Sequence, residues 1–241
     1  GGVATADVRA DIGDLGPFSA LAGRDLSGSV AARIAGTAEP DLSQFDLTVT
    51  GESKDLAIGV AQLDPVLAGT GTLWGQLQRT TPGSLKIDGF RLATPALGLS
   101  ATADITDGTG VADFALALTD AGLVEPRLSG PVQISGNAAL DAEAMTTLSV
   151  NGIGPGATQL GIDATLTSPE DGSEMAGTLE ANIGTLSAFS GLAGRDLAGQ
   201  LTARLGGTGR MDLSGFDVTY DIAGTDIVAE GIPLNGALTV R

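Results

Sequence analysis

Residues 11–48 read DIGDLGPFSALAGRDLSGSVAARIAGTAEPDLSQFDLT, and residues 182–219 read NIGTLSAFSGLAGRDLAGQLTARLGGTGRMDLSGFDVT. The offset, 182 − 11 = 171, holds without a gap, and about half of the aligned positions are identical. Weaker copies of the pattern begin at Leu63 and Leu123. Repeats of this kind bury their apolar faces against their neighbours. The sequence therefore predicts a single elongated β-repeat segment, 1–241, made of about four modules, roughly 11–62, 63–122, 123–181 and 182–241.

Apolar and polar residues alternate with a period of two inside the repeats and in most segments between them. In residues 45–50, for example, Phe45, Leu47 and Val49 alternate with polar residues. This pattern indicates strands with one apolar and one polar face. Turn-forming residues at 81–83, 107–108 and 169–172 separate the strands, and short connections favour antiparallel neighbours.

About fourteen such strands fit into the chain, whereas open sheets rarely exceed about ten strands without curling. We therefore expect an all-β fold, an elongated, curled and mostly antiparallel sheet with an aliphatic interior. Helical signals are few: Pro17 suits a helix start and Gly23 a helix end. We expect one or two short helices, near 17–23 and 188–194, that cover an edge or rim. Because so short a helix is unstable alone, Phe18 and Leu21 should pack against the sheet.

The parity of the strands defines one apolar face, and we predict that this face forms a hydrophobic groove for lipid acyl chains. Charged substitutions there should abolish lipid binding, whereas changes at Thr48, Gln133 or Asp163 on the polar face should not. The predicted groove-lining residues are Val30, Ile34, Phe45, Leu47, Val49, Leu99, Leu116, Leu118, Val132, Ile134, Leu140, Leu148, Val150, Leu160, Ile162, Leu166, Leu179, Leu201, Leu205, Phe216, Val218, Tyr220 and Ile222.

The composition excludes several classes of partner. The chain is 42% hydrophobic but only 3% aromatic, so its apolar surface is almost purely aliphatic. With 29 acidic and 12 basic residues, the net charge of −17 repels nucleic acid and anionic lipid head groups. Any lipid contact should therefore be made with the tails. The first ten residues lack a signal-peptide pattern, and no apolar run is long enough for a membrane-spanning helix.

The chain contains no histidine and no cysteine, which removes the commonest general base, the commonest metal ligand and the thiol nucleophile. Two acid pairs, Asp11 with Asp14 and Glu170 with Asp171, could in principle support acid hydrolysis. Both pairs lie in turn-like sequence, where carboxylates are usually solvated. We therefore expect no enzyme activity, no cofactor and no metal site.

Three further motifs have structural explanations that we favour. Glycine-rich stretches at 69–75 and 206–209 lack the residues of a phosphate-binding loop, so we expect turns and bulges there. Acidic, glycine-rich sequence can bind calcium, but the established calcium-loop registers are absent. The repeated pairs Arg24-Asp25 and Arg195-Asp196 are expected to form a helix-ending turn with a local charge pair.

The units FSxLAGRDLxG, residues 18–28 and 189–199, are each followed by GT and DLSxFD, and in these motifs the chain resembles the TamB/AsmA-like family of bacterial envelope proteins. The resemblance covers essentially the whole chain, although the motifs consist of leucine, glycine and small residues. It implies a β-taco, a curled sheet with a hydrophobic interior. It also implies a location in the periplasm of a Gram-negative bacterium, with the full-length protein anchored in the inner membrane.

The same resemblance implies a function and partners. Family members are implicated in phospholipid transfer between the inner and outer membranes and in outer-membrane protein assembly, with an outer-membrane barrel partner of the TamA type. No membrane anchor or docking segment is recognisable here, so we expect an interior fragment whose partner-binding regions lie elsewhere. Two alternatives stay open: an adhesin-like parallel β-solenoid with a structural role, and a chaperone-like scaffold that guides nascent strands by strand addition.

Overall fold

The computed structural model describes residues 2–141, 145–167, 174–210, 214–230 and 232–233. It is all-β, a curled and mostly antiparallel sheet with short helical turns, as the sequence predicts. The chain divides into two compact units, Gly1–Thr119 and Asp120–Arg241. This division lies close to the predicted boundary between the second and third modules, at 122/123. The finer division into four modules stays a prediction.

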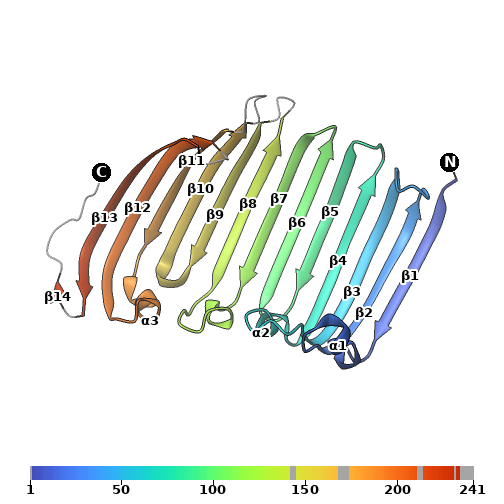
Figure 1. Ribbon diagram of the computed structural model, residues 1–241, viewed down its shortest axis with the longest axis horizontal. Coiled ribbons are helices and arrows are strands. Elements are labelled where there is room, and N and C mark those ends of the chain that lie inside the picture. The colour runs from blue at the N-terminus through green and yellow to red at the C-terminus, as the bar shows by residue number, and fades with distance from the viewer. Residues whose placement is uncertain (1, 142–144, 168–173, 211–213, 231, 234–241) are drawn as a thin grey trace. The chain divides into compact units, whose positions relative to one another are not determined.

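In the first unit each strand pairs with the next one along the chain, so the strands form an antiparallel meander (Figure 1). Two short helices, α1 (Ser19–Ala22) and α2 (Asp64–Leu67), lie at the same end of these strands. The strands are β1 Ala4–Ile12, β2 Ser27–Ala38, β3 Phe45–Ala57, β4 Thr70–Arg79, β5 Ser84–Ala93, β6 Leu97–Thr106 and β7 Thr109–Leu118.

The second unit repeats this arrangement, again with antiparallel pairing between consecutive strands. Its one α-helix, among the residues that the structure describes, is α3 (Ser190–Ala193), which lies between β11 and β12. The strands are β8 Val132–Leu140, β9 Thr146–Gly154, β10 Thr158–Thr167, β11 Glu174–Ile183, β12 Leu197–Arg210, β13 Phe216–Ala229 and β14 Ile232–Pro233.

The two copies of the long repeat fold alike at the start of β2 and β12. Each strand lies opposite a β-bulge of its partner: the register with β3 shifts between Ser27 and Ser29 of β2, and the register with β13 shifts between Ala198 and Gln200 of β12. The extra residue lies in the partner strand, and the single residue opposite it is a glycine in both copies, Gly28 with φ 91° and Gly199 with φ 100°. Side chains rarely tolerate such backbone angles, so glycine is the residue that this bulge requires.

The predicted helix at 17–23 consists of a 3₁₀ turn, Gly16–Phe18, followed by α1, and Gly23 ends it in the left-handed conformation with φ 66°. The expected packing of Leu21 against the sheet is wrong, because this side chain is 88% exposed. A hydrogen bond holds the turn instead: the Leu26 N–H donates to Ser19 Oγ over 2.9 Å.

The predicted helix at 188–194 shows the same construction, with a 3₁₀ turn, Leu186–Phe189, before α3. Ser190 Oγ accepts from the Leu197 N–H over 3.0 Å, in the same geometry as in the first copy. Gly194 ends the helix with φ 65°. The repeat is therefore conserved down to a single side-chain contact with the backbone.

Within the described residues, neither unit has a large sealed core. Among the described residues the buried apolar side chains are Val66, Ala96, Ala121 and Pro155, and no side chain is fully buried. All four lie outside the strands: Val66 in α2, Ala121 and Pro155 in 3₁₀ turns, and Ala96 in the connection between β5 and β6. The aliphatic residues of the strands are thus half-buried or exposed, which leaves one face of each sheet accessible.

Candidate functional site: the apolar face

Directly paired residues of antiparallel strands point to the same side of a sheet, so the strand register assigns each side chain to a face. In the first unit the pairs Ile34 with Val49, Leu47 with Leu77, and Leu99 with Leu116 lie on one side, which we call the apolar face. The register brings all predicted lining residues of this unit to that face: Val30, Ile34, Phe45, Leu47, Val49, Leu99, Leu116 and Leu118.

The second unit has an equivalent apolar face. Val150 pairs with Ile162, Ile162 with Leu179, and Leu179 with Leu205, so four neighbouring strands contribute to one row. The register and strand parity place all predicted lining residues of this unit on the same side: Val132, Ile134, Leu140, Leu148, Val150, Leu160, Ile162, Leu166, Leu179, Leu201, Leu205, Phe216, Val218, Tyr220 and Ile222.

The apolar side chains differ in exposure along the second unit. In its middle strands most of them are half-buried by one another. In β13 they are more open, with Phe216 76% and Val218 51% exposed. In isolation such exposure is ordinary, but a contiguous apolar surface of this kind is typical of a binding site.

Charge is almost absent from the apolar faces. In the first unit the paired positions include one ionisable side chain, Arg79, at the end of β4, where it pairs with Phe45. The Arg79 guanidinium carbon lies 5.3 Å from the centre of the Phe45 ring, a cation–π contact. In the second unit none of the paired, described positions on this face is charged. The charged side chains of the strands therefore lie almost wholly on the polar face.

Sequence reasoning missed several apolar-face residues in β4 and β5, among them Leu73, Leu77, Ile87, Phe90 and Leu92. One extra residue lies in β5, which shifts its register against β4 between Trp74 and Gln76 and against β6 between Ile87 and Phe90. An extra residue reverses the parity of everything after it, so alternation alone cannot assign β5, whereas β4 pairs with β3 without a shift and its Leu73 and Leu77 follow plain alternation. The Asp-Gly pair at 88–89 in an otherwise strand-like stretch was the available signal.

Hollows in the second unit are lined mainly by polar-face residues, although one of about 660 Å³ also includes Leu179, Leu205, Val218 and Tyr220 of the apolar face. One of about 580 Å³ is lined by Asn151, Asn182 and Asp221, together with neighbouring residues. Ile222, which points to the apolar face beside Asp221, does not line it. The apolar face is therefore described as an open surface, because its side chains are half-buried or exposed to solvent.

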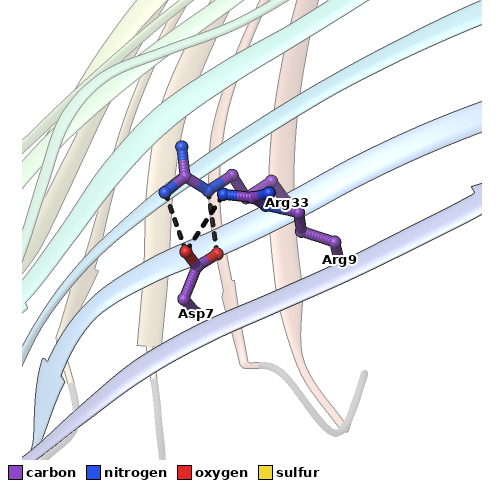
Figure 2. A network of polar contacts seen from close by, with 3 residues as sticks. All are labelled: Asp7, Arg9 and Arg33. Atoms are coloured by element: carbon purple, nitrogen blue, oxygen red, sulfur yellow. Dashed lines mark hydrogen bonds and ion pairs between the residues drawn. The ribbon is translucent and has the colours of Figure 1, made fainter.

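An ion-pair network lies on the polar face of β1 and β2 (Figure 2). Arg33 donates from Nε and Nη2 to the two carboxylate oxygens of Asp7, each over 2.9 Å, and Arg9 Nη2 donates to Asp7 over 3.2 Å. Hydrogen bonding from Arg33, with added attraction from Arg9, lowers the pKa of the Asp7 carboxyl. These side chains are solvent-exposed, so the network joins charged groups on the polar face and buries none of them.

Three further carboxyls in turns have lowered pKa values for local reasons. Ser43 donates to Asp41 and lowers its pKa, and the backbone N–H groups of Gly122 and Gly130 do the same for Asp120. Arg127 lowers the pKa of Glu125 to about 2 through side-chain hydrogen bonding. Each carboxyl is thus stabilised in its ionised form, which suits a structural role in turns.

The other sequence candidates take structural positions. Asp14 accepts from the Gly16 N–H over 2.8 Å, and Asp11 lies on the polar face opposite Ala31. The pair Glu170 and Asp171 lies outside the described residues. In the stretch 69–75 only Gly69 precedes the strand and residues 70–75 are the first part of β4, so the expected turn is wrong there, and 206–209 lies inside β12. Within the described ranges there is no group of three or more acidic side chains arranged to hold a metal ion.

The repeated Arg-Asp pairs follow the glycines that end the two helical turns, as predicted. The Arg24 N–H donates to the Ser19 carbonyl over 3.3 Å, and Arg195 makes the same bond to Ser190. The expected local charge pair is not found: the ion pairs among the described residues include neither Arg24 nor Arg195. The backbone of these residues closes the turn, and their side chains are exposed.

In the part of the chain that the structure describes, no helix has the length and apolar character needed to cross a membrane. Comparisons of the chain with protein-family models, with curated proteins and with solved structures find no match.

Proposed function

We propose that the chain binds lipid acyl chains on the apolar face of each of its two units and lets them pass along these faces, as part of phospholipid transfer between two membranes. The single observation that carries this proposal is the separation of the strands into an aliphatic face almost without charge and a polar face that holds the ionised side chains. Each tail would lie on the aliphatic residues while its head group stays in water.

The energetic argument concerns the cost of exposing a tail. Moving an acyl chain of about sixteen carbons into water costs about 12 kcal/mol, at roughly 0.8 kcal/mol for each methylene. A surface of similar aliphatic residues lowers that cost at every step and offers nearly equal sites to a moving chain. Aromatic side chains, which give shape-specific packing, are few in this chain, so weak selectivity along the face is expected.

The register of the second unit suggests how a tail would lie. A row of mostly small side chains crosses the strands at Ala138, Ala164, Gly177 and Gly207, with Leu148 between the first two. The row beside it consists mostly of large side chains, among them Ile162 and Leu205. From β8 to β12 such a row spans about 19 Å at about 4.8 Å between strands. One acyl chain occupies about half of a bilayer core of roughly 30 Å, so the dimensions match.

The cellular setting belongs to the same proposal. The resemblance of the repeated FSxLAGRDLxG units to the TamB/AsmA-like family supports a periplasmic protein of Gram-negative bacteria that is anchored in the inner membrane in full length. A barrel partner of the TamA type and a role in outer-membrane protein assembly would follow. The burial of the described residues is compatible with this setting, because none of their side chains is fully buried and an aliphatic face is left available to lipid.

Adjacent residues on opposite faces give a matched test. Leu160→Asp adds a negative charge to the apolar face of β10, and Gln159→Asp adds the same charge one residue away on the polar face. Leu99→Asp and Ser100→Asp form the equivalent pair in β6 of the first unit. Two readouts apply: phospholipid that co-purifies with the chain, measured by mass spectrometry, and transfer of labelled phosphatidylcholine between vesicles.

The apolar-face variants should lose at least tenfold in bound lipid and in transfer rate, while the polar-face variants stay within about twofold of the wild type. A tenfold loss corresponds to about 1.4 kcal/mol. Circular dichroism must show the same strand content in all four variants. Equal loss in both members of a pair, or no loss in either, would count against lipid binding on this face.

A second function is favoured by a separate observation, the edge position of β1 in the sheet. An edge strand has backbone groups available for strand addition, so β1 could hold a nascent strand of a membrane barrel. Because the chain has no cysteine, Thr5→Cys in β1 and Thr102→Cys in the central strand β6 provide single reactive sites. Cross-linking of an unfolded barrel protein to the first but not the second would support this role. The parallel solenoid alternative is not compatible with the antiparallel pairing of the described strands.

A further inference from the structure

The polar face of the first unit carries one large aromatic side chain, Trp74 in β4. It pairs with Thr50 in β3 and with Arg91 in β5, so it points away from the aliphatic side. It is 42% exposed and is the single tryptophan of the chain. An indole among exposed polar side chains does not contribute to packing on the apolar face. Its position therefore requires another explanation.

The indole ring packs in a defined position against the backbone. A methyl group added to Gly89 would lie 2.7 Å from Cζ3 and 3.5 Å from Cη2 of the Trp74 ring, so the six-membered ring sits against the Gly89 backbone. Gly89 has φ 64° and lies in the bulge between β4 and β5. Glycine there leaves room for the ring and sets how closely the ring approaches the backbone of β5. Contact with backbone on one side restricts the ring, while the exposed part stays available to a ligand.

Polar groups continue from the indole along the same face of β4. Gln76 Nε2 donates to one carboxylate oxygen of Asp46 over 2.8 Å, and Gln78 Nε2 donates to the other over 3.1 Å. This shared acceptor fixes both amide groups and leaves each Oε1 as an acceptor. From Trp74 to Gln78 the row extends about 13 Å, at about 3.3 Å per residue. Arg91 adds fixed positive charge and donors beside the ring.

We propose that Trp74, Gln76, Gln78 and Arg91 form a binding site for an uncharged oligosaccharide. The apolar C–H face of a pyranose ring would stack on the indole, whose ring face carries partial negative charge. Sugar hydroxyls would donate to the glutamine oxygens and accept from the Arg91 guanidinium. The length of the row accommodates more than one sugar ring. This site lies on the face opposite to the proposed lipid surface and is independent of it.

The charged residues around Trp74 and the lack of a second aromatic ring in its row argue against other ligands. Lys86 and Asp88 lie opposite Gln78 and Gln76, so the site carries both signs of charge and matches neither a polyanion nor a polycation. A quaternary ammonium ligand would require a cage of several aromatic rings, and Trp74 has no aromatic partner in its row, where Thr50 and Arg91 flank it.

Fluorescence tests the proposal directly, because all tryptophan emission comes from Trp74. The full chain is titrated separately with maltohexaose, cellohexaose and chitohexaose, and binding is also measured by isothermal titration calorimetry. A single stacked ring with a few hydrogen bonds should give a Kd on the order of 1 mM. We expect a saturable change in emission with at least one of the three sugars. If none changes the emission or gives heat up to about ten times that concentration, the proposal is overturned.

Variants locate the site. Trp74→Ala should abolish the calorimetric signal, and Gln76→Ala, which keeps the fluorophore, should weaken binding at least threefold. Gly89→Ala should displace the indole, change the emission of the free protein and weaken binding. Thr102→Ala on the polar face of β6 is the control and should bind like the wild type. Unchanged binding by Trp74→Ala would overturn the proposal, and phospholipid transfer by all these variants should match the wild type, which separates this site from the lipid surface.

Discussion

Two glycines in the repeated bulges give the sharpest expectation at the scale of single residues. A Cβ atom at Gly28 would lie 2.4 Å from the Asp55 carbonyl oxygen, and one at Gly199 would lie 2.5 Å from that of Asp226. Both positions also have positive φ. We expect Gly28→Ala and Gly199→Ala each to cost about 2 kcal/mol or more in free energy of unfolding, measured with urea.

Gly161 in β10 is the matched control, because an added methyl group there meets no atom within 4 Å and φ is not positive. Gly161→Ala should leave stability unchanged or raise it by up to about 0.5 kcal/mol, since alanine restricts the unfolded chain. A loss in the control as large as in the bulge variants would show that the bulge geometry is not the cause.

The Asp7 network predicts a pH dependence. Arg33 lowers the pKa of Asp7 in the folded state, so the unfolded state binds the proton more readily. The stabilisation from Asp7 is therefore fully present above the ordinary carboxyl pKa of about 4 and is lost as the pH falls below it. In thermal unfolding, the difference in Tm between wild type and Asp7→Asn should be constant above about pH 5 and shrink toward zero in acid.

A control for this measurement is Asp113→Asn, on the polar face of β7, for which no ion pair is found among the described residues. Its Tm difference should not follow the same pH course. Salt should reduce the Asp7 effect, because the network is exposed and screened. A difference between wild type and Asp7→Asn that persists unchanged at pH 2 would contradict the role assigned to the carboxylate.

Residue positions in regular strands were predictable from the sequence, and those near bulges were not. Leu160 and Ile162 lie where alternation places them, because β10 has no register shift against its partners. Phe90 and Leu92 escaped prediction, because the bulge at Gly89 reverses parity within one strand. Trp74 shows a second limit of prediction from the sequence. A large apolar residue on a polar face contradicts the alternation pattern from which the faces are assigned.

At the scale of elements, the helical turns α1 and α3 depend on one serine each. Ser19 Oγ accepts from the Leu26 N–H over 2.9 Å, and Ser190 Oγ accepts from the Leu197 N–H over 3.0 Å. Ser19→Ala leaves a part-buried N–H without this partner and should cost about 1 kcal/mol locally. Hydrogen exchange at the Leu26 amide should accelerate about fivefold.

Ser190→Ala should have the same effect on Leu197, which provides an internal repetition of the experiment. Ser187→Ala is the control, because its side chain is exposed and no hydrogen bond to it is found in the described part of the chain. If exchange at Leu26 and Leu197 does not change, the turns are held by their backbone bonds, such as Arg24 N–H to the Ser19 carbonyl.

The sequence indicated these turns through Pro17, Gly23 and the repeat, but it could not indicate how they are held. Apolar spacing suggested that Leu21 packs on the sheet, and the structure leaves it almost fully exposed. A helix of four residues has too little side-chain surface to be positioned by burial alone. The polar side chain of Ser19 does this instead, and hydrophobic patterns contain no information about it.

For the whole molecule, the all-β fold and antiparallel order follow from period-two alternation and short turns, and both were predictable. The division at Thr119 and Asp120 was not predictable as a division into compact units, because the weak echo at Leu123 resembles the one at Leu63. The small number of buried residues also has no signature in composition: a 42% hydrophobic chain could have formed a filled sandwich. Whether an apolar face meets another sheet or solvent is a tertiary outcome.

Stability should accordingly be local. Each strand pairs only with its neighbours along the chain, and no shared core of fully buried side chains connects distant strands within the described residues. Stability in such proteins is close to a sum of neighbour terms. Gly28→Ala should therefore increase hydrogen exchange in β1 to β4 while amides of β10 to β12 keep wild-type protection, and Gly199→Ala should do the reverse. Residue-resolved hydrogen exchange measures both variants in one experiment. Equal loss of protection in both units from either substitution would instead show that the two units unfold as one cooperative body.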